Sequence, residues 1–395
     1  MKRRDFLRSS GVLLAGSWLG ASFLRTAHAT GTPIVAGPGP YGSLQAADAN
    51  GIMLPAGFSS RVIAQAGFPV AGTGYNWHGF PDGGDTFAVP GGYVYVSNAE
   101  IPLNGAVSAI RFDQDGNILA AYNILSGSNT NCAGGRTLWG TWLSCEEAIN
   151  GRVWECDPLG GPPVLRLAMG TFQHEAVAQD PNDPARFYLT EDRGDGGFYR
   201  FTSSVVGDLS SGLLEIAEVV DDGSGGPGGN VVWHEVPNPN DFSVENATRY
   251  QVPESTPFDG GEGIVWARGM VFFTTKGDNR VWAYDPADAS LCVHYDVATD
   301  PGQQLSGVDN ITTSRSGDLY VAEDGGNMEI VLLSPEATAS PLLRILGQDT
   351  SEICGPAFDP LQRRLYFSSQ RAGLFGAGIT YEVTGPFRNG TSCLG

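Results

Sequence analysis

The sequence predicts an all-β fold, a six-bladed β-propeller with an insertion in the blade region around residues 203–260. Composition is the first reason, because 55 Gly and 25 Pro accompany 19 Phe and 13 Tyr, a mixture typical of many short strands joined by tight turns. The second reason is a strand pattern that recurs at a nearly constant interval. The third is a polar position that recurs at a fixed distance before it.

The recurring strand pattern ends in small or polar residues, as in Tyr95-Val96-Ser97-Asn98 and Tyr320-Val321-Ala322-Glu323. Its second apolar residue falls at positions 96, 143, 189, 273, 321 and 367, which gives spacings of 47, 46, 84, 48 and 46. About 45 residues is the length of one four-stranded propeller blade. The long interval coincides with a stretch rich in Gly, Asp, Pro and Ser, which predicts the insertion.

The N-terminus predicts export. Arg3-Arg4-Asp5-Phe6-Leu7 precedes a short apolar run and the small residues around Ala27–Ala29, a pattern typical of a twin-arginine signal peptide. We therefore expect residues 1–29 to be the signal and residues 30–395 to form a single propeller domain. The expected location is the periplasm or the exterior of a bacterium, reached through the twin-arginine machinery, without stable membrane association.

The net charge of −20 disfavours nucleic acid and anionic membranes as partners, because both carry negative charge. It favours cations. A general solubilising role remains the alternative for carboxylates that are scattered over the surface.

A polar or small residue lies eleven to fourteen positions before five of the repeat anchors: Cys132, Glu175, Glu262, Asp309 and Cys354. In the first blade we expect Tyr75–Gly79 to be equivalent. Since the innermost strand of each propeller blade starts at the same end of the channel, these residues should form a ring. The following strand returns to that face and brings further acids, so we expect bound cations to keep the carboxylates ionised.

Oxygen ligands of this kind favour calcium, whereas Cys132 would add a soft ligand that favours a transition metal. A buried core thiol and half of a disulfide are the alternatives for Cys132. Six cysteines in an oxidising compartment can all pair, and Cys145 with Cys156 is the bridge that their spacing across one hairpin favours. The sequence contains no Gly-x-Ser-x-Gly, His-Glu-x-x-His or P-loop motif, which disfavours serine hydrolase and nucleotide chemistry.

The string Asn131–Gly135 through Trp139–Glu147 resembles the PhoX-type alkaline phosphatases. Similar resemblances are carried by His174–Val177, by Leu189–Arg193 and by Val308–Ile311. The resemblance implies a metal-dependent phosphoric ester hydrolase with iron and calcium in the propeller channel, acting on a small phosphate ester. It implies that Cys132, Glu175 and Glu262 bind iron, and that calcium is bound by residues among Glu146, Glu191, Asp192, Asp309, Asn310 and Glu323.

The chain also departs from the family pattern. Larger PhoX-type enzymes have a histidine where this chain reads Leu103–Ser108, and an arginine shortly before the residue equivalent to Glu262, where it reads Asp259-Gly260-Gly261. Lys276 and Arg371 are the cationic side chains expected near the channel in their place. His78 or His174 could act as a general acid, although a structural role is the alternative for both. We expect a monomer.

Two other functions fit the same ring of residues. A gluconolactonase-like propeller would use a single calcium, held by residues such as Glu262, Asp309 and Asn310, to open sugar lactones. A non-catalytic propeller would use calcium only to stabilise the ring and would bind a partner on one face. Metal content distinguishes these alternatives.

Overall fold

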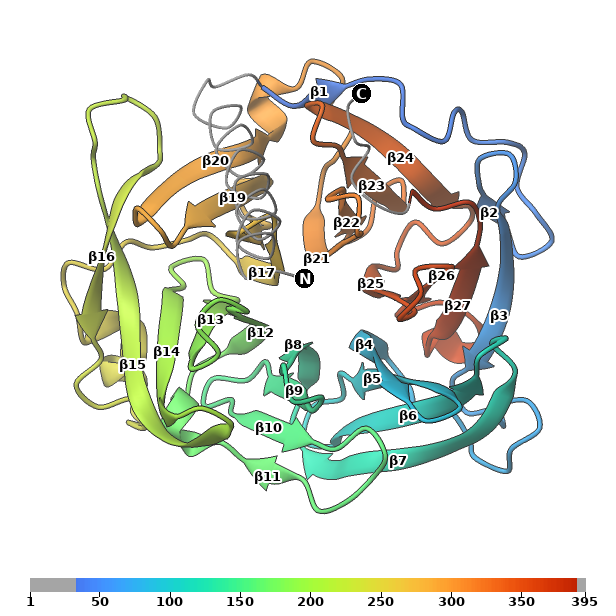
Figure 1. The fold of residues 1–395 in the computed structure, drawn as a ribbon, viewed down its shortest axis with the longest axis horizontal. Helices are drawn as coiled ribbons and strands as arrows, with labels where there is room; N and C mark the ends of the chain where they lie inside the picture. Colours follow the sequence, from blue (N-terminus) through green and yellow to red (C-terminus); the bar gives the residue numbers. More distant parts are fainter. Residues whose placement is uncertain (1–32, 389–395) are drawn as a thin grey trace, which may run out of the picture.

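The structure is a computed structural model that describes residues 33–388. Antiparallel sheets are arranged around a common axis with their innermost strands toward the centre (Figure 1). The protein is therefore an all-β, propeller-like fold, as the sequence predicts. The export signal predicted for residues 1–29 lies outside the described residues. Within residues 33–388, none of the helical segments has the length and apolar character needed to cross a membrane.

Each sheet is built mainly from consecutive strands that pair as a meander, and in the described part of the chain the strands group as follows. The first sheet contains β4 (Pro81–Val89), β5 (Gly92–Ala99), β6 (Gly105–Asp113) and β7 (Ile118–Ser128), and the second contains β8 (Asn131–Arg136), β9 (Trp142–Glu146), β10 (Val153–Cys156) and β11 (Val164–Leu165). A larger sheet has the order β12 (His174–Gln179), β13 (Arg186–Glu191), β14 (Phe198–Val205), β15 (Asp208–Val220), β16 (Gly229–Glu235), β20 (Ser290–Asp296), β19 (Arg280–Asp285), β18 (Met270–Thr275) and β17 (Gly261–Ala267). The next contains β21 (Val308–Thr313), β22 (Leu319–Glu323), β23 (Glu329–Leu333) and β24 (Thr338–Ile345), to which β1 (Val35–Ala36) and β2 (Ile52–Met53) are added.

The ring is closed by strands from opposite ends of the chain. The last sheet consists of β25 (Ile353–Phe358), β26 (Arg364–Ser369), β27 (Ile379–Thr384) and the N-terminal strand β3 (Ser59–Gln65). β3 pairs with β27 from Ser59 opposite Thr384 to Gln65 opposite Ile379. This pairing adds the fourth strand to the last sheet and joins the N-terminal segment to the C-terminal one.

The innermost strands β4, β8, β12, β17, β21 and β25 contact one another in a closed ring. The apolar anchors of the predicted repeat lie on the strands next to them, and all are fully buried: Val96, Leu143, Leu189, Phe273, Val321 and Phe367. The repeat is therefore confirmed, because each anchor occupies the same place between neighbouring sheets. Burial of these large side chains from sheet to sheet stabilises the ring.

The segment around residues 203–260 is structured rather than an open loop. It contains all of β15 and β16, followed by the short 3₁₀ turns η2 (Val244–Asn246) and η3 (Thr248–Tyr250). β16 pairs with β20 through Gly229 opposite Leu291 and Asn230 opposite Ser290, which joins two meanders into the larger sheet. Arg249, at the end of this segment, reaches back to Glu191 of β13 with a 2.7 Å ion pair.

The predicted disulfide between Cys145 and Cys156 is wrong. Cys145 lies opposite Val153 in the β9–β10 ladder, whereas Cys156 lies opposite Trp142. Both thiols are free and buried. The two cysteines thus occupy opposite ends of the hairpin, because Trp142 and Cys145 are three residues apart on one strand.

Candidate metal centre

Every innermost strand has a β-bulge at its start. The register shifts fall between Pro81 and Gly84, Asn131 and Gly134, His174 and Val177, Gly261 and Ile264, Val308 and Ile311, and Cys354 and Ala357. A bulge redirects the side chain of the extra residue. Five residues lie inside these shifts, namely Asp82, Cys132, Glu175, Glu262 and Asp309, and Cys354 directly precedes the sixth shift. We call these six residues the bulge ring.

The bulge ring contains the five residues predicted from the repeat, but its member from the first blade differs from the prediction. β4 begins at Pro81, so Asp82 is the equivalent residue of the first inner strand. The expectation that Tyr75–Gly79 takes this place is wrong. The correct position could have been found, because Asp82 precedes Val96 by fourteen residues, within the spacing shared by the other members.

A second ring lies where the chain leaves the next strand of each sheet. We call it the exit ring; it consists of Glu100, Glu147, Asp192, Lys276, Asp324 and Gln370, each one residue beyond the end of β5, β9, β13, β18, β22 or β26. All six residues interact with one another or with bulge-ring residues through hydrogen bonds or charge, and Gln370 donates to both Glu100 and Asp82. The two rings therefore face the same end of the channel.

Two groups of ligand atoms within these rings are close enough to hold a metal ion. Cys132, Glu147 and Glu175 form one group, and Glu175, Glu262 and Asp309 form the other; within each group the ligand atoms lie within 4.8 Å of one another. Glu175 belongs to both. This arrangement allows one carboxylate to bridge two positions.

The environment of Glu175 shows whether these residues suit a metal ion. Its side chain is fully buried, and neither carboxylate oxygen accepts a hydrogen bond. Burial, and after it the charges of Glu147 and Asp309, raise the pKa of Glu175 well above its usual range, whereas the nearby thiol of Cys132 lowers it to a smaller extent. A buried carboxylate without donors is costly unless a cation binds it. The residues present therefore fit a metal centre.

The neighbouring carboxylates are under the same constraint. Burial, and after it the charge of other channel acids, raises the pKa of Asp82, Glu262 and Asp309 well above the usual range. For Glu147, burial with Asp192 and Glu100 nearby raises the pKa to about 8. These acids favour protonation in the absence of a cation, and a bound cation would keep them ionised.

Lys276 lies in the exit ring beside the second group. Its Nζ is 2.8 Å from Asp192 Oδ2 and 2.5 Å from Glu262 Oε1. Burial alone would lower the pKa of Lys276, but the two carboxylates raise it far more, so the amine stays charged. Its side chain is 41% exposed, so the positive charge of Lys276 lies between the buried carboxylates and solvent.

Arg371 supplies a second cation at the same end of the channel. Its Nη1 is 2.7 Å from Glu352 Oε2, and Asp324 Oδ1 lies at 4.0 Å. Its side chain is 44% exposed. Both predicted cationic residues are therefore next to the carboxylate groups.

Asn310 has a supporting position. Its Nδ2 donates to Asp309 Oδ1 at 2.8 Å, and its Oδ1 accepts from the backbone N–H of Gly355 at 2.6 Å. Asn310 therefore orients Asp309 and ties β21 to β25.

Glu146, Glu191 and Glu323 lie outside both groups, within the sheets. Each is the last residue of its strand, and its oxygens accept hydrogen bonds locally. Glu146 is bound by Arg152, Trp154 and the N–H of Asn129, Glu191 by Arg249, Tyr199 and the N–H of Gly197, and Glu323 by the N–H groups of Ser306 and Glu329. The residue that follows each of them belongs to the exit ring.

The two histidines considered from the sequence belong to neither of these groups. His78 stacks on Trp77 with 4.5 Å between ring centroids, and its Nδ1 lies 3.2 Å from the carbonyl oxygen of Gly79. His174 stacks on Phe172 and contacts the carbonyl of Gly170. Burial lowers the pKa of His78 to about 4 and that of His174 to about 3. These contacts favour a structural role for both rings.

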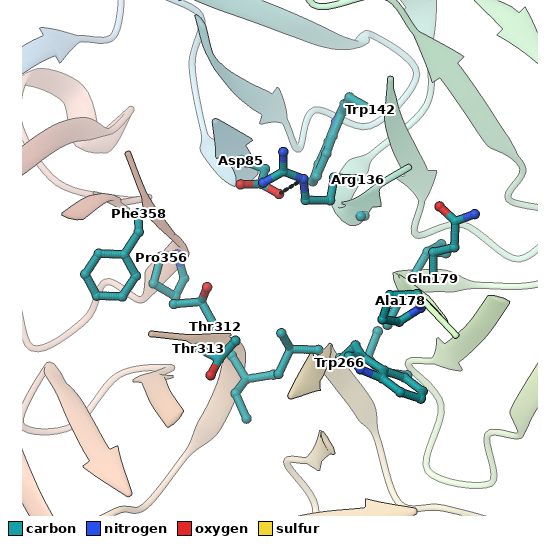
Figure 2. Close-up of a pocket in the computed structure, with 18 of the residues that line it drawn as sticks. Asp85, Arg136, Trp142, Ala178, Gln179, Trp266, Thr312, Thr313, Pro356 and Phe358 are labelled. Carbon is teal, nitrogen blue, oxygen red and sulfur yellow. Dashed lines mark ion pairs between the residues drawn. The ribbon is translucent and has the colours of Figure 1, made fainter. Parts of the chain in front are cut away.

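A cavity lies at the opposite end of the inner strands (Figure 2). It measures about 420 Å³ and is lined by Asp85, Arg136, Trp142, Gln179 and Trp266, among others, but by no member of either ring. A much smaller space of about 40 Å³, lined by small residues such as Gly83, Ala133, Gly263 and Gly355, lies at the inner-strand bulges. The channel therefore narrows just behind the bulge ring, and Lys276 and Arg371 lie at the other end of it from this cavity.

A comparison with protein families decides the class of this protein. The model of the family described as alkaline phosphatase PhoX matches residues 103–373. The chain belongs to the PhoX alkaline phosphatase family. The matched region contains every ligand of the two groups around Glu175, together with Lys276 and Arg371. Family membership implies a metal-dependent phosphatase, in agreement with the resemblance seen in the sequence.

Solved structures agree with this family in fold. PhoX from Pseudomonas fluorescens, in complex with the transition-state analogue vanadate, aligns with a TM-score of 0.72 at 16% identity and covers 89% of this chain and 98% of its own. A gluconolactonase from Xanthomonas campestris aligns with a TM-score of 0.50 at 13% identity, covering 88% of this chain and 99% of its own. Identities this low show the fold alone. A sequence comparison with curated proteins gives no significant match.

Proposed function

We propose that this PhoX-family protein hydrolyses small phosphate esters at metal ions held by Cys132, Glu147, Glu175, Glu262 and Asp309. The observation that carries this proposal is the position of Glu175, whose two unpaired, buried oxygens lie between a thiol on one side and two carboxylates on the other. Glu146, Glu191 and Glu323 are left out of this ligand set because their oxygens are bonded within the sheets.

The ligand types suit two kinds of ion. A thiolate with two carboxylates favours a transition metal, for which we propose iron at Cys132, Glu147 and Glu175. Oxygen ligands alone favour a hard cation, for which we propose calcium beside Glu262 and Asp309. Bound ions of this kind polarise phosphoryl oxygens and lower the pKa of a bound water.

The chain's own cations position the substrate. Lys276 and Arg371 are partly exposed and stand at the end of the channel from which solvent enters. Each cation is paired with a carboxylate that a metal ion would also attract. Lys276 is paired with Glu262, and Arg371 is paired with Glu352. Metal binding would therefore weaken these ion pairs and leave the amine and the guanidinium to bind phosphoryl oxygens, in place of the arginine that larger relatives have before the residue equivalent to Glu262.

The first experiment combines elemental analysis with an activity assay. The protein is purified from its secreted fraction without chelator or added metal, and turnover of a chromogenic phosphomonoester is measured. We expect iron and calcium together with phosphatase activity, and Cys132→Ser should lose iron and activity while remaining folded. Calcium alone without turnover would contradict the proposal and leave the lactonase-like or non-catalytic alternative.

Two further points remain proposals of the same kind. We propose that the larger sheet counts as two blades joined through β16 and β20, which gives six blades in one domain from residue 30 to residue 395. The Arg3-Arg4 signal supports export through the twin-arginine pathway to the periplasm or beyond. Detection of a mature chain that starts near Thr30, and loss of export when both arginines are replaced by lysine, would test this location.

A further inference from the structure

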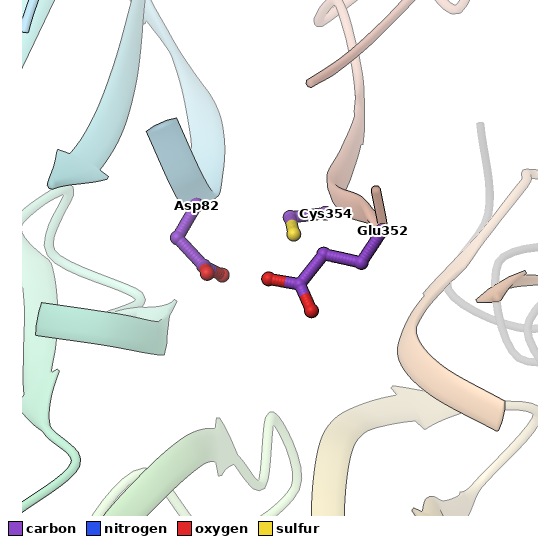
Figure 3. Close-up of side chains that lie close together, drawn as sticks. All are labelled: Asp82, Glu352 and Cys354. Carbon is purple, nitrogen blue, oxygen red and sulfur yellow. The ribbon is translucent and has the colours of Figure 1, made fainter. Parts of the chain in front are cut away.

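A third group of potential ligands lies on the other side of the bulge ring. Asp82, Glu352 and Cys354 are all buried, and one ligand atom from each lies within 4.8 Å of the other two. Figure 3 shows the sulfur of Cys354 and the carboxylates of Asp82 and Glu352 pointing toward one another. The group shares no residue with the two groups around Glu175.

The thiol of Cys354 has the environment of a ligand rather than of a core residue. Its side chain is 1% exposed. Within residues 33–388 its sulfur neither donates nor accepts a hydrogen bond. The groups near it are mainly carboxylates, with the guanidinium of Arg371 and the phenol of Tyr95 beside them, whereas a structural buried cysteine is normally surrounded by apolar side chains. Arg371 pairs with Glu352 and offsets one negative charge, so the second acid and the thiol still require a further cation or protons.

The backbone holds the three residues in place. Gly355 has a φ of +59°, and a Cβ built there would lie 2.6 Å from the carbonyl oxygen of Asp82. Glycine at this position therefore lets β25 approach β4 closely, which brings Cys354 to Asp82. The hydrogen bond from the Gly355 N–H to Asn310 Oδ1 fixes the same turn from the other side.

The two carboxylates are oriented and still have capacity to bind an ion. Asp82 Oδ1 accepts from the N–H of Gly83 at 2.7 Å and Oδ2 accepts from Gln370 Nε2 at 2.5 Å. Glu352 Oε2 pairs with Arg371. Each carboxylate oxygen has two lone pairs, so these contacts fix the side chains without saturating them.

The size and chemistry of the group indicate the kind of ion. Zn–S and Zn–O bonds of about 2.3 Å and about 2.1 Å at a tetrahedral angle place the ligand atoms about 3.6 Å apart. Shifts of roughly 1 Å or less, within reach of side-chain rotation, would close the group around one ion. A thiolate beside two carboxylates favours a divalent transition metal over calcium or magnesium.

We propose that Asp82, Glu352 and Cys354 form a separate transition-metal site in the channel, suited to zinc or ferrous iron. This site goes beyond the proposed phosphatase centre and does not depend on its activity. It would give the protein two thiolate-bound ions, one at Cys132 and one at Cys354, on either side of Asp82 in the ring.

The test is titration of the full metal-depleted protein with divalent cobalt, whose thiolate complexes have a charge-transfer band in the near ultraviolet. We compare the wild type with Cys354→Ser, Cys132→Ser and the double variant. Cys292→Ser is the matched control, because Cys292 is a free thiol on β20 outside the rings. We expect Cys354→Ser to remove about half of the thiolate band and one cobalt equivalent, the double variant to remove the whole band, and the control to change neither.

The outcomes separate this site from the proposed phosphatase centre. If the Cys132 centre does not bind a transition metal, Cys132→Ser leaves the band unchanged and Cys354→Ser abolishes it. If a folded Cys354→Ser protein keeps the full band and the full cobalt stoichiometry, the separate site is overturned. Should Cys354→Ser fail to fold, Asp82→Asn keeps the thiol and still has to lose one cobalt equivalent; an unchanged stoichiometry would overturn the proposal equally.

Discussion

Lys276 Nζ lies 2.5 Å from Oε1 of Glu262, a carboxylate that is 3% exposed and belongs to the proposed metal centre. The same amine also contacts Asp192. Lys276 thus occupies the boundary between the buried acids and solvent, where a phosphoryl group entering the channel would first meet positive charge. The chain contains one other lysine, Lys2, in the predicted signal.

Replacing Lys276 should impair catalysis more than stability. We expect Lys276→Met to lower kcat/KM for a phosphomonoester by about 30-fold to about 1,000-fold, because one cationic group at a transition state contributes roughly 2–4 kcal/mol. Steady-state kinetics on the metal-loaded protein measures the effect. Arg136→Met is the control, since Arg136 lines the cavity at the opposite end of the channel. Equal losses in the two variants would contradict a role for Lys276 at the substrate.

The structure predicts different results for two adjacent glutamates. Glu147→Gln should lower the iron content, because Glu147 belongs to the group that includes Cys132. Glu146→Gln should retain iron and instead destabilise the fold by about 1–3 kcal/mol, since it weakens a charge-assisted network with Arg152 and Trp154. Elemental analysis and urea unfolding of both variants check this pair. Loss of iron in Glu146→Gln, with iron kept in Glu147→Gln, would reverse the assignment.

These two glutamates also show which features of the site could be predicted from the sequence and which could not. The period of the anchors identified the blades, because large apolar residues such as Val96 and Leu143 recur wherever one sheet packs on the next. Its spacing also located Cys132, Glu175, Glu262 and Asp309. Which of two neighbouring acids enters the channel depends on the residue at which the strand ends, and a change of one position reverses the side chain. The strand pattern in the sequence ends at Cys145, one residue before β9 ends at Glu146, and for Asp82 sequence reasoning aligned the wrong segment.

Metal-free protein should lose stability as the pH rises. Burial raises the pKa of Glu147 to about 8 and that of Glu352 to about 7, from an ordinary value of 4.5. Between the ordinary and the raised values the folded state binds more protons than the unfolded state, so the free energy of unfolding falls with increasing pH. The stabilisation is complete below about pH 4.5 and is lost by about pH 8. Thermal unfolding in chelator across this range measures the effect.

Metal ions should remove this dependence, because they replace protons on the same oxygens. We expect the metal-loaded protein to keep a nearly constant Tm from pH 6 to pH 9. Glu147→Gln in chelator provides the control, since it removes one of the groups that titrate and should flatten the curve. A metal-free wild type that becomes more stable with rising pH would contradict the buried, protonated state of these carboxylates.

Gly355 tests whether close approach of β25 to β4 holds the channel together. Gly355→Ala would place a methyl group 2.6 Å from the carbonyl oxygen of Asp82, at a φ of +59°. Gly347→Ala is a matched control, because Gly347 has a φ of +75° with open space around its Cβ position. The backbone penalty of roughly 1 kcal/mol is common to both, so any larger loss in Gly355→Ala measures the displacement of the two strands. We expect that loss to exceed the control by at least about 1 kcal/mol in urea unfolding, and equal losses would show that the strands can separate without cost.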